Sequence, residues 1–324
     1  FDASSGDIER AFPGYGGQGV RLSPDGRRFV GQPFVEPGIL GPVHIRDVES
    51  GEVLVTLEGL CSFDAGTGQP ATDCADDSQA RGDSLYWSDF SRDGSMIAIG
   101  GGTVGGAEGI TGVWDAETGK RLTWLAAGDL VGNDGVVVAF DPATAHLLVA
   151  TSGLVVYSTD GWSAIADLPL GWAWLDVVFT PDGRHVIGAD TVDGIVTVDT
   201  ETWEYVGEPL AGQENTARDI DLNGDGSLFA SGASDEFVRI SDVATGQLIQ
   251  AIPIGDASIN LVEFLDDQHL LIVGQGREAL VVTIDERELT DSARASVTRS
   301  LSAEECATYH VDPCPTLAEI RSEI

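Results

Sequence analysis

A short turn motif recurs along this chain and limits, more than any other feature, what the chain can fold into. In each copy, a Ser, Thr or Asn stands three residues before a Gly, and Asp comes directly before that Gly. Short runs rich in apolar and β-branched residues lie on both sides of each copy. Because Gly readily takes the positive φ angle that tight turns between antiparallel strands require, the motif predicts hairpins. Four copies are clear: Ser23–Gly26, Ser91–Gly94, Thr180–Gly183 and Asn223–Gly226.

A second turn motif, Asp-x-x-Ser/Thr-Gly, recurs with the same period. In the first motif, Asp182 and Asp225 of successive copies are 43 residues apart. At the place of the second motif, Asp242 and Asp285 are also 43 residues apart. A period of about 40 to 45 residues with four short strands in each unit is typical of β-propeller blades. The clear copies of this second motif are Asp47–Gly51, Asp115–Gly119 and Asp242–Gly246.

The strand pattern predicts an all-β, six-bladed β-propeller over residues 1–289. Six units reach a third strand, but only five continue into a fourth strand of their own. At the other end of the chain, Phe1–Phe12 reads as a turn followed by an outer strand. We therefore expect this N-terminal strand to complete the last blade and cover its exposed edge. If the sequence is cut from a longer protein, Phe1–Phe12 belongs to another blade, and seven blades is the alternative.

Two stretches interrupt the repeat, an insert at 58–80 and a tail at 290–324 that reads as partly helical, and they carry all 4 cysteines. Three disulfide connectivities are possible. Pairing within each stretch, Cys61 with Cys74 and Cys306 with Cys314, is the most economical. Disulfides would tie down segments that cannot build a core, and would favour an extracytoplasmic location; unpaired thiols would favour the cytoplasm.

Other ligand-binding motifs are incomplete, so we predict no metal and no cofactor. Cys306, His310 and Cys314 have a spacing that could hold zinc, but prolines on both sides of Cys314 oppose a continuous helix and no fourth ligand is evident. Asp221–Gly226 resembles the start of a calcium loop but has Gly232 at the twelfth position, where Glu is needed. A Gly-rich stretch from 100 to 109 lacks the Gly-Lys-Ser/Thr ending of a phosphate loop.

The repeat resembles the WD40 family across nearly all of residues 1–289. Trp114-Asp115 is the one literal Trp-Asp dipeptide, and the equivalent places in other units are Arg46-Asp47, Val198-Asp199, Ser241-Asp242 and Ile284-Asp285. The Gly-His dipeptide of that family is missing from every unit. The resemblance is therefore to a degenerate, bacterial-style WD40 propeller. It implies the fold, but it does not imply the hydrogen-bond network of the family.

The tail is similar to those that close the WD40 regions of large actinobacterial regulatory and signalling proteins. In such proteins the propeller is joined to an N-terminal effector domain. The resemblance implies that this chain is the propeller of a larger regulatory protein. The matching residues are Leu301, Ser302, Glu305, Cys306, Tyr309, Cys314 and Pro315.

The formal net charge of −36 comes from 53 Asp and Glu against 17 Lys and Arg, and it is spread along the chain. Such a surface repels nucleic-acid phosphate and anionic lipid, so we exclude direct nucleic-acid binding and direct membrane insertion. Two interpretations stay open. The charge serves solubility or adaptation to salt, or it attracts a basic partner or cations.

Aromatic and polar residues near the starts of the inner strands are the best binding candidates, since loops of successive blades converge there. Trp and Arg are also favoured anchors at protein interfaces. The alternative is structural: Trp at alternating strand positions packs between blades. The candidates are Tyr86, Trp87, Trp172, Trp174, Asn215, Arg218 and Asp219.

No catalytic constellation is recognisable, because the 5 histidines lie mostly in or beside strands and no Gly-x-Ser-x-Gly elbow occurs. We therefore predict a non-catalytic interaction or sensory module that binds a protein or peptide and is monomeric as an isolated domain. One alternative is a propeller enzyme, a hydrolase or lyase, with a site dispersed around the central channel. The enzyme hypothesis predicts a narrow channel pocket with carboxylates or histidines of shifted pKa. The interaction-module hypothesis predicts instead a broad face with exposed aromatic side chains. The other alternative is a stand-alone exported binding protein.

Overall fold

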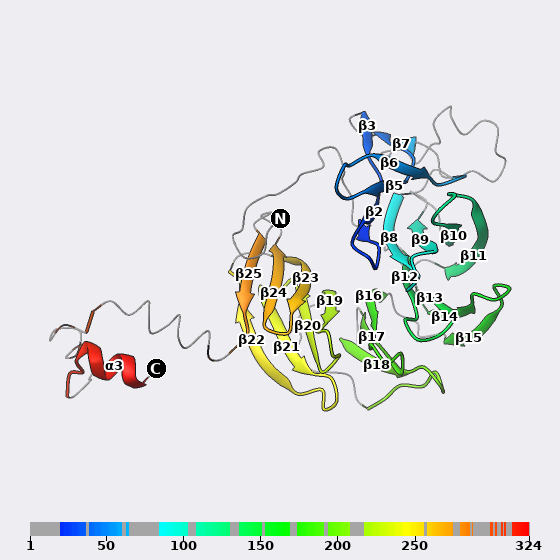
Figure 1. Cartoon of the computed structure of the whole chain (residues 1–324). Helices are drawn as coiled ribbons and strands as arrows, with labels where there is room; N and C mark the ends of the chain where they lie inside the picture. Colours follow the sequence, from blue (N-terminus) through cyan, green and yellow to red (C-terminus); the bar gives the residue numbers. More distant parts are fainter. Residues whose placement is uncertain are drawn as a thin grey trace.

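The computed structural model of the chain consists of short antiparallel sheets that follow one another around a ring (Figure 1). Element labels below are those of Figure 1. The structure describes residues 20–36, 39–59, 63–64, 84–102, 108–129, 136–150, 153–168, 174–190, 194–207, 217–255, 258–274, 279–285, 287, 299–300, 302, 306, 308 and 313–323.

Six of the sheets are the blades of a β-propeller, and each runs in sequence order from its first strand at the ring axis outward. Blade 1 contains β1 (Arg21–Leu22), β2 (Arg28–Gly31), β5 (His44–Asp47) and β6 (Val53–Thr56). Blade 2 contains β8 (Ser84–Phe90), β9 (Met96–Gly102), β10 (Glu108–Asp115) and β11 (Arg121–Asp129). Blade 3 contains β12 (Val137–Phe140), β13 (His146–Ala150), β14 (Leu154–Ser158) and β15 (Ala164–Leu168).

The remaining three blades complete the ring, and two of them have three described strands. Blade 4 contains β16 (Trp174–Phe179), β17 (His185–Asp190) and β18 (Ile195–Asp199). Blade 5 contains β19 (Ala217–Leu222), β20 (Leu228–Ala233), β21 (Phe237–Asp242) and β22 (Leu248–Pro253). Blade 6 contains β23 (Ile259–Asp266), β24 (His269–Gly274) and β25 (Ala279–Thr283). The predicted six-bladed, all-β architecture is confirmed. The strand predicted to complete blade 6, Phe1–Phe12, lies outside the described residues, so that closure stays a prediction.

The first turn motif closes the hairpins between the first two strands of its blades, as predicted. In blade 2 the Ser91 hydroxyl donates to Asp93 Oδ1 over 2.8 Å and accepts the Met96 N–H over 2.9 Å. Gly94 takes a φ of 67° and its N–H donates to the Ser91 carbonyl. Blade 4 repeats this arrangement with Thr180 in place of Ser.

The second motif connects the third and fourth strands of its blades in the same local manner. The backbone N–H and hydroxyl of Thr118 both donate to Asp115 Oδ1 over 2.7 Å, and Gly119 has a φ of 74°. Blade 4 departs from the motif, since Trp203 stands in the Gly position and still takes a φ of 56°. Its N–H donates to the Asp199 carbonyl as the Gly119 N–H does to the Asp115 carbonyl. The turn geometry is therefore kept even where the residue type opposes it.

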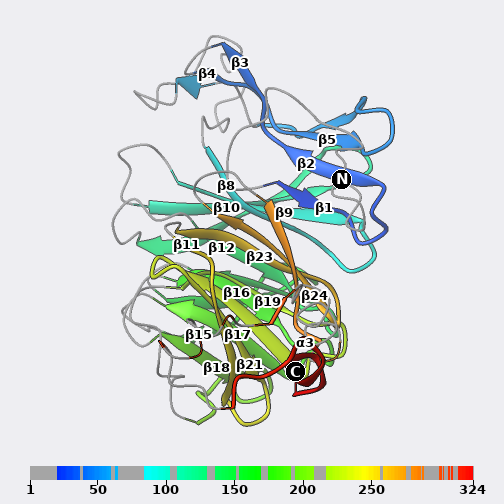
Figure 2. The ribbon, with the colours of Figure 1, turned by 90° about the vertical axis from the view of Figure 1, so that its left-hand side faces the viewer.

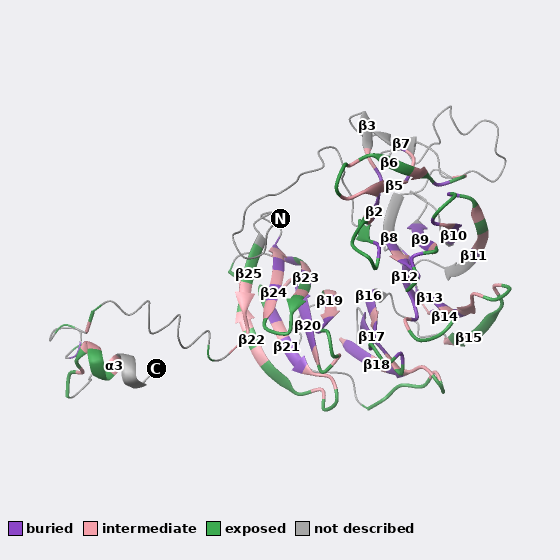
Figure 3. Cartoon of the chain, viewed as in Figure 1, coloured by how far each residue is buried: buried purple, intermediate pink, exposed green. Residues whose placement is uncertain are grey.

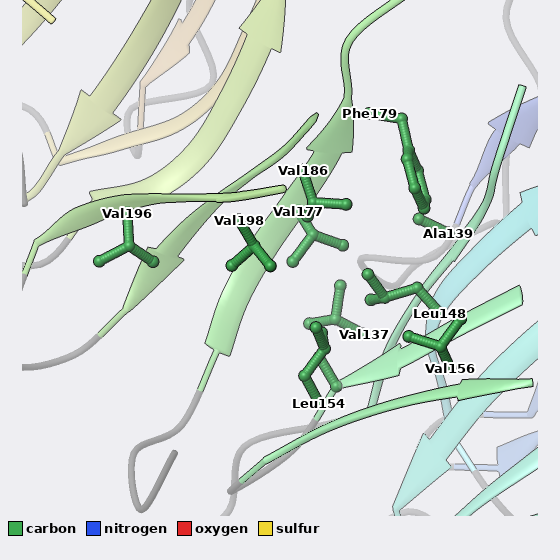
Figure 4. Packing of buried hydrophobic residues seen from close by; sticks show 11 residues of the cluster. Val137, Ala139, Leu148, Leu154, Val156, Val177, Phe179, Val186, Val196 and Val198 are labelled. Atoms are coloured by element: carbon green, nitrogen blue, oxygen red, sulfur yellow. The ribbon is translucent and has the colours of Figure 1, made fainter. Parts of the chain in front are cut away.

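The hydrophobic core lies at the seams between neighbouring blades. Figure 4 shows the seam between blades 3 and 4, where Phe179 of β16 lies against Ala139 of β12. Each of the other seams from blade 1 to blade 6 has a buried cluster of the same kind. In blades 1 to 5 the second strand is mostly buried, and in β24 of blade 6 buried and partly buried residues alternate. The outer strands β6, β15 and β22 are mostly exposed (Figure 3).

The literal Trp-Asp dipeptide contributes to two structural features. The Trp114 side chain is fully buried at the seam between blades 1 and 2, and its Nε1–H donates to the Glu58 carbonyl over 2.8 Å. Its ring meets that of Trp124 edge-on, with 5.5 Å between centroids. Asp115 belongs to the turn described above. Trp114 therefore holds two blades together.

Two features lie outside the blades. A small antiparallel sheet of β3 (Phe34–Glu36), β4 (Ile39–Leu40) and β7 (Phe63–Asp64) extends beyond blade 1, as Figure 2 shows for β3 and β4. It brings part of the insert at 58–80 into contact with the loop between β2 and β5, which sequence patterns had not indicated. In the tail, Cys306 and Cys314 form the predicted disulfide and α3 (Leu317–Glu323) follows it. Cys61 and Cys74 lie outside the described residues.

Candidate functional site

The first strands of the blades form the innermost layer of the propeller. From blade 1 to blade 6, the first strands of consecutive blades contact one another. Each is an edge strand, so one row of its N–H and C=O groups lacks a partner within its own sheet. The buried N–H groups of such an edge need acceptors from elsewhere in the protein.

Aspartate side chains of the preceding blade accept several of these edge N–H groups. Asp89 Oδ2 in blade 2 accepts the N–H of Phe140 in blade 3 over 2.8 Å. Asp176 Oδ2 in blade 4 accepts the N–H of Ile220 in blade 5 over 2.9 Å. These bonds join first strands that are 51 and 44 residues apart in sequence.

Blade 5 makes the same connection twice. Asp219 Oδ2 accepts the N–H of Val262, and Asp221 Oδ2 accepts the N–H of Phe264, each over 2.7 Å. Both acceptors lie on β19 and both donors on β23. Asp89, Asp176, Asp219 and Asp221, which we call the axial carboxylates, therefore fasten the first strands of blades 2, 4 and 5 to the blades that follow.

Arginine 21 of blade 1 brings a positive charge to the axial carboxylates. Its Nε lies 3.6 Å from Asp89 Oδ1, and its side chain is 59% exposed, so water reaches it. Desolvation by the surrounding protein lowers the pKa of Arg21, but attraction by all four axial carboxylates outweighs this and the pKa is raised. The guanidinium is therefore held in its charged form by aspartates of three other blades.

Burial shifts the axial carboxylates toward the protonated form. It raises the pKa of Asp176 and of Asp221 to about 6, against the opposing effect of their backbone hydrogen bonds. Burial, followed by repulsion from Asp176, raises the pKa of Asp219 well above its ordinary value. The pKa of Asp89 is also raised by burial, although Arg21 lowers it in part. The group can therefore bind and release protons in the mildly acidic range.

Three of the residues proposed from the sequence are described with their side chains. Asp219 is one of the axial carboxylates. Arg218, next to it on β19, is exposed and donates from Nε to Ser234 Oγ over 2.7 Å. Trp87 of blade 2 packs against the buried clusters on both sides of blade 3, as the structural alternative predicts. Whether any of them contacts a ligand stays a prediction.

The other proposed residues are not placed. Trp172 and Asn215 lie outside the described residues, and the side chains of Tyr86 and Trp174, both in strands, are not described. The calcium-like segment Asp221–Gly226 is the end of β19 followed by a turn. Asp221 bonds to blade 6, and in the turn Asp225 Oδ1 accepts the Ser227 N–H. Within the described part of the chain, no group of three or more His, Cys, Asp or Glu residues could hold a metal ion.

Sequence reasoning proposed Asp219 but missed Asp89, Asp176, Asp221 and Arg21. A signal for them is present in the repeat. Asp89 and Asp221 each stand two residues before the turn residue Ser91 or Asn223, and Arg21 holds the same position before Ser23. Asp176 and Asp219 stand four residues before the turn. Comparing these columns of the repeat would have separated these aspartates from the many others.

No protein-family model matches the sequence, and no curated protein matches it significantly. Among the described residues, no helix is long and apolar enough to cross a membrane.

Proposed function

We propose that this propeller is a non-catalytic interaction module that recognises a basic segment of a protein or peptide at its axis. The observation that carries the proposal is the set of four axial carboxylates on the first strands of blades 2, 4 and 5, with Arg21 as the cation among them. An added Lys or Arg side chain would find negative charge on several sides, at a position that the ring holds rigidly.

The charge of the whole chain supports the same class of partner. With a formal net charge of −36, the protein attracts cationic segments over long range and repels anionic ones. Water reaches Arg21 at the axis, and Asp89, Asp219 and Asp221 are only partly buried. A side chain that enters from solvent can therefore approach these carboxylates.

The cellular setting rests on sequence resemblance alone. The WD40-like turns and the Leu301-to-Pro315 tail pattern support a propeller that belongs to a larger bacterial signalling or transcription-regulatory protein. In that setting, the module would present a rigid acidic site, and another domain would convert its occupancy into a response.

The test is a calorimetric titration with peptides that differ in charge. We expect an Arg-rich peptide to bind, a Glu-rich peptide of the same length not to bind, and affinity to fall steeply with salt. Asp219→Asn/Asp221→Asn should weaken binding about tenfold or more, because two of the axial charges are removed. The control is Asp160→Asn, since Asp160 is exposed in the turn between β14 and β15. Equal affinity in the double variant and this control would contradict the proposal.

A second candidate function, a propeller enzyme, is favoured by one observation. Asp221 is only partly buried, and with a pKa raised to about 6 it has the proton affinity of a general acid. A screen of ester, glycoside and phosphate substrates tests it. An activity that Asp221→Asn abolishes and Asp160→Asn preserves would favour the enzyme over the module.

A further inference from the structure

Three of the axial carboxylates gather at two neighbouring seams. Asp176 lies on β16, and Asp219 and Asp221 lie on β19. Their hydrogen bonds to Ile220, Val262 and Phe264 cross the seams between blades 4 and 5 and between blades 5 and 6. We call these three residues the seam carboxylates.

The surrounding strands bring little positive charge to this cluster. Among the described residues, Arg21 of β1 is the one cation that acts on all three seam carboxylates, and it lies closest to Asp89 of β8. Glu263 of β23 adds a further negative charge beside Asp221. β12 and β20 have no titratable side chain, and His185 of β17 acts on the turn residues Asp182 and Asp199 instead.

This imbalance makes full ionisation of the cluster costly. Asp176 is 7% exposed, and Asp219 and Asp221 are half-buried. Several like charges in such surroundings repel one another more strongly than they would in bulk water. Proton uptake relieves that repulsion and leaves a carbonyl oxygen that still accepts the backbone N–H. The raised pKa values of the three groups agree with this account.

We propose that the seam carboxylates make the contacts between blades 4, 5 and 6 sensitive to pH. These blades are held together most tightly while the cluster carries a proton, and the seams between them open more often once that proton is lost. Above the range in which the cluster titrates, the same residues that fasten the seams repel one another. This pH response is a property of the fold itself and does not depend on what the propeller binds.

Hydrogen exchange tests this pH response of the seams. It is measured on the whole chain at pH 5.5 and pH 7.5 and corrected for the intrinsic pH dependence of exchange. We expect the N–H groups of Ile220, Val262 and Phe264 to lose about tenfold or more of their protection at the higher pH, since loss of one proton changes an equilibrium constant up to about tenfold per pH unit. Amides of β13, in the middle of blade 3, serve as the internal reference and should keep their protection.

Variants decide whether the seam carboxylates cause the effect. In Asp219→Asn/Asp221→Asn, protection of Ile220, Val262 and Phe264 should differ by less than about threefold between the two pH values. Asp160→Asn, which also removes negative charge, should behave as the unaltered protein. An equal loss of protection at the seams and in β13, or a double variant that keeps the full pH response, would overturn the proposal.

Infrared spectroscopy of the unaltered protein gives a readout that needs no variant. A protonated carboxyl group that persists at pH 6 and disappears by pH 8, in step with the change in exchange, is the expected result. Absence of any protonated carboxyl group at pH 6 would also overturn the proposal.

Discussion

Aspartate side chains serve two opposite purposes in this propeller. In the turns of Asp93, Asp115 and Asp242 they are at least partly exposed, and hydrogen bonds hold their pKa values below the ordinary one; for Asp115 the hydroxyl of Thr118 is the main cause. At the axis they are buried, and burial raises their pKa values, as in Asp176. The same residue type therefore fixes the local hairpins in one place and joins distant blades in the other.

Replacing Asp221 separates its hydrogen bond from its charge. At pH 5, Asp221→Ala should lower the free energy of unfolding by about 1 kcal/mol, because the N–H of Phe264 loses its acceptor. Asp221→Asn keeps an oxygen acceptor and should lower it by less. Urea denaturation of the two variants side by side measures the difference. Equal losses would show that this bond does not contribute to stability.

Two glycines with the same backbone conformation should differ in how they tolerate alanine. Gly26 has a φ of 67° and open space around it, so Gly26→Ala should cost about 1 to 2 kcal/mol for the left-handed conformation alone. At Gly119, with a φ of 74°, the new Cβ would lie 2.3 Å from the Thr56 carbonyl oxygen. Gly119→Ala should therefore cost at least about 1 kcal/mol more in chemical denaturation. A smaller loss for Gly119→Ala than for Gly26→Ala would contradict the close contact between blades 1 and 2.

At the scale of strands and helices, the exposed third strand of blade 6 is the site of the predicted closure by Phe1–Phe12. Leu280 and Val281 on β25 are each 39% exposed among the described residues. If the N-terminal segment pairs with β25, its deletion should speed hydrogen exchange in β25 and leave β18 of blade 4 unchanged. Unchanged exchange in β25 would contradict the predicted pairing of Phe1–Phe12 with this strand.

The tail disulfide should stabilise its own segment and leave the propeller unchanged. Cys306 and Cys314 are separated by 8 residues, and the bond closes a loop next to α3. Because both cysteines lie in the tail and outside the blades, Cys306→Ser/Cys314→Ser should change the unfolding free energy of the propeller by less than about 0.5 kcal/mol. Thermal unfolding followed by near-ultraviolet circular dichroism measures this. A large drop in Tm would show that the tail supports the ring.

Sequence predicted the blades well because their turns depend on local chemistry. The bonds of Asp115 to Thr118 and the φ of Gly119 lie within five residues and can be read from one motif. The bond from Asp176 to Ile220 spans 44 residues, and it depends on how two blades are aligned, which no local pattern encodes. The sheet of β3, β4 and β7 was missed because strands of two or three residues are too short to show alternation. Trp203 takes a conformation that its residue type opposes.

For the whole molecule, the raised pKa values of Asp176 and Asp221 set the direction of its pH response. The folded protein binds more protons than the unfolded chain between about pH 4 and pH 6, so stability is greatest below this range and falls as pH rises through about 6. The turn aspartates, whose pKa values are lowered, act in the opposite direction below about pH 4. We expect maximal stability near pH 4, measured as the urea midpoint across pH. A maximum at pH 7 or above would contradict this.

The most direct test of the central claim is to map where a basic peptide binds. With isotope-labelled protein, addition of an Arg-rich peptide should shift the NMR signals of the N–H groups that donate to the axial carboxylates, namely those of Phe140, Ile220, Val262 and Phe264. Signals from the outer strands β6, β15 and β22 should stay in place. Shifts confined to the outer strands, or no shift at the four axial N–H groups at saturating peptide, would contradict recognition at the axis of the ring.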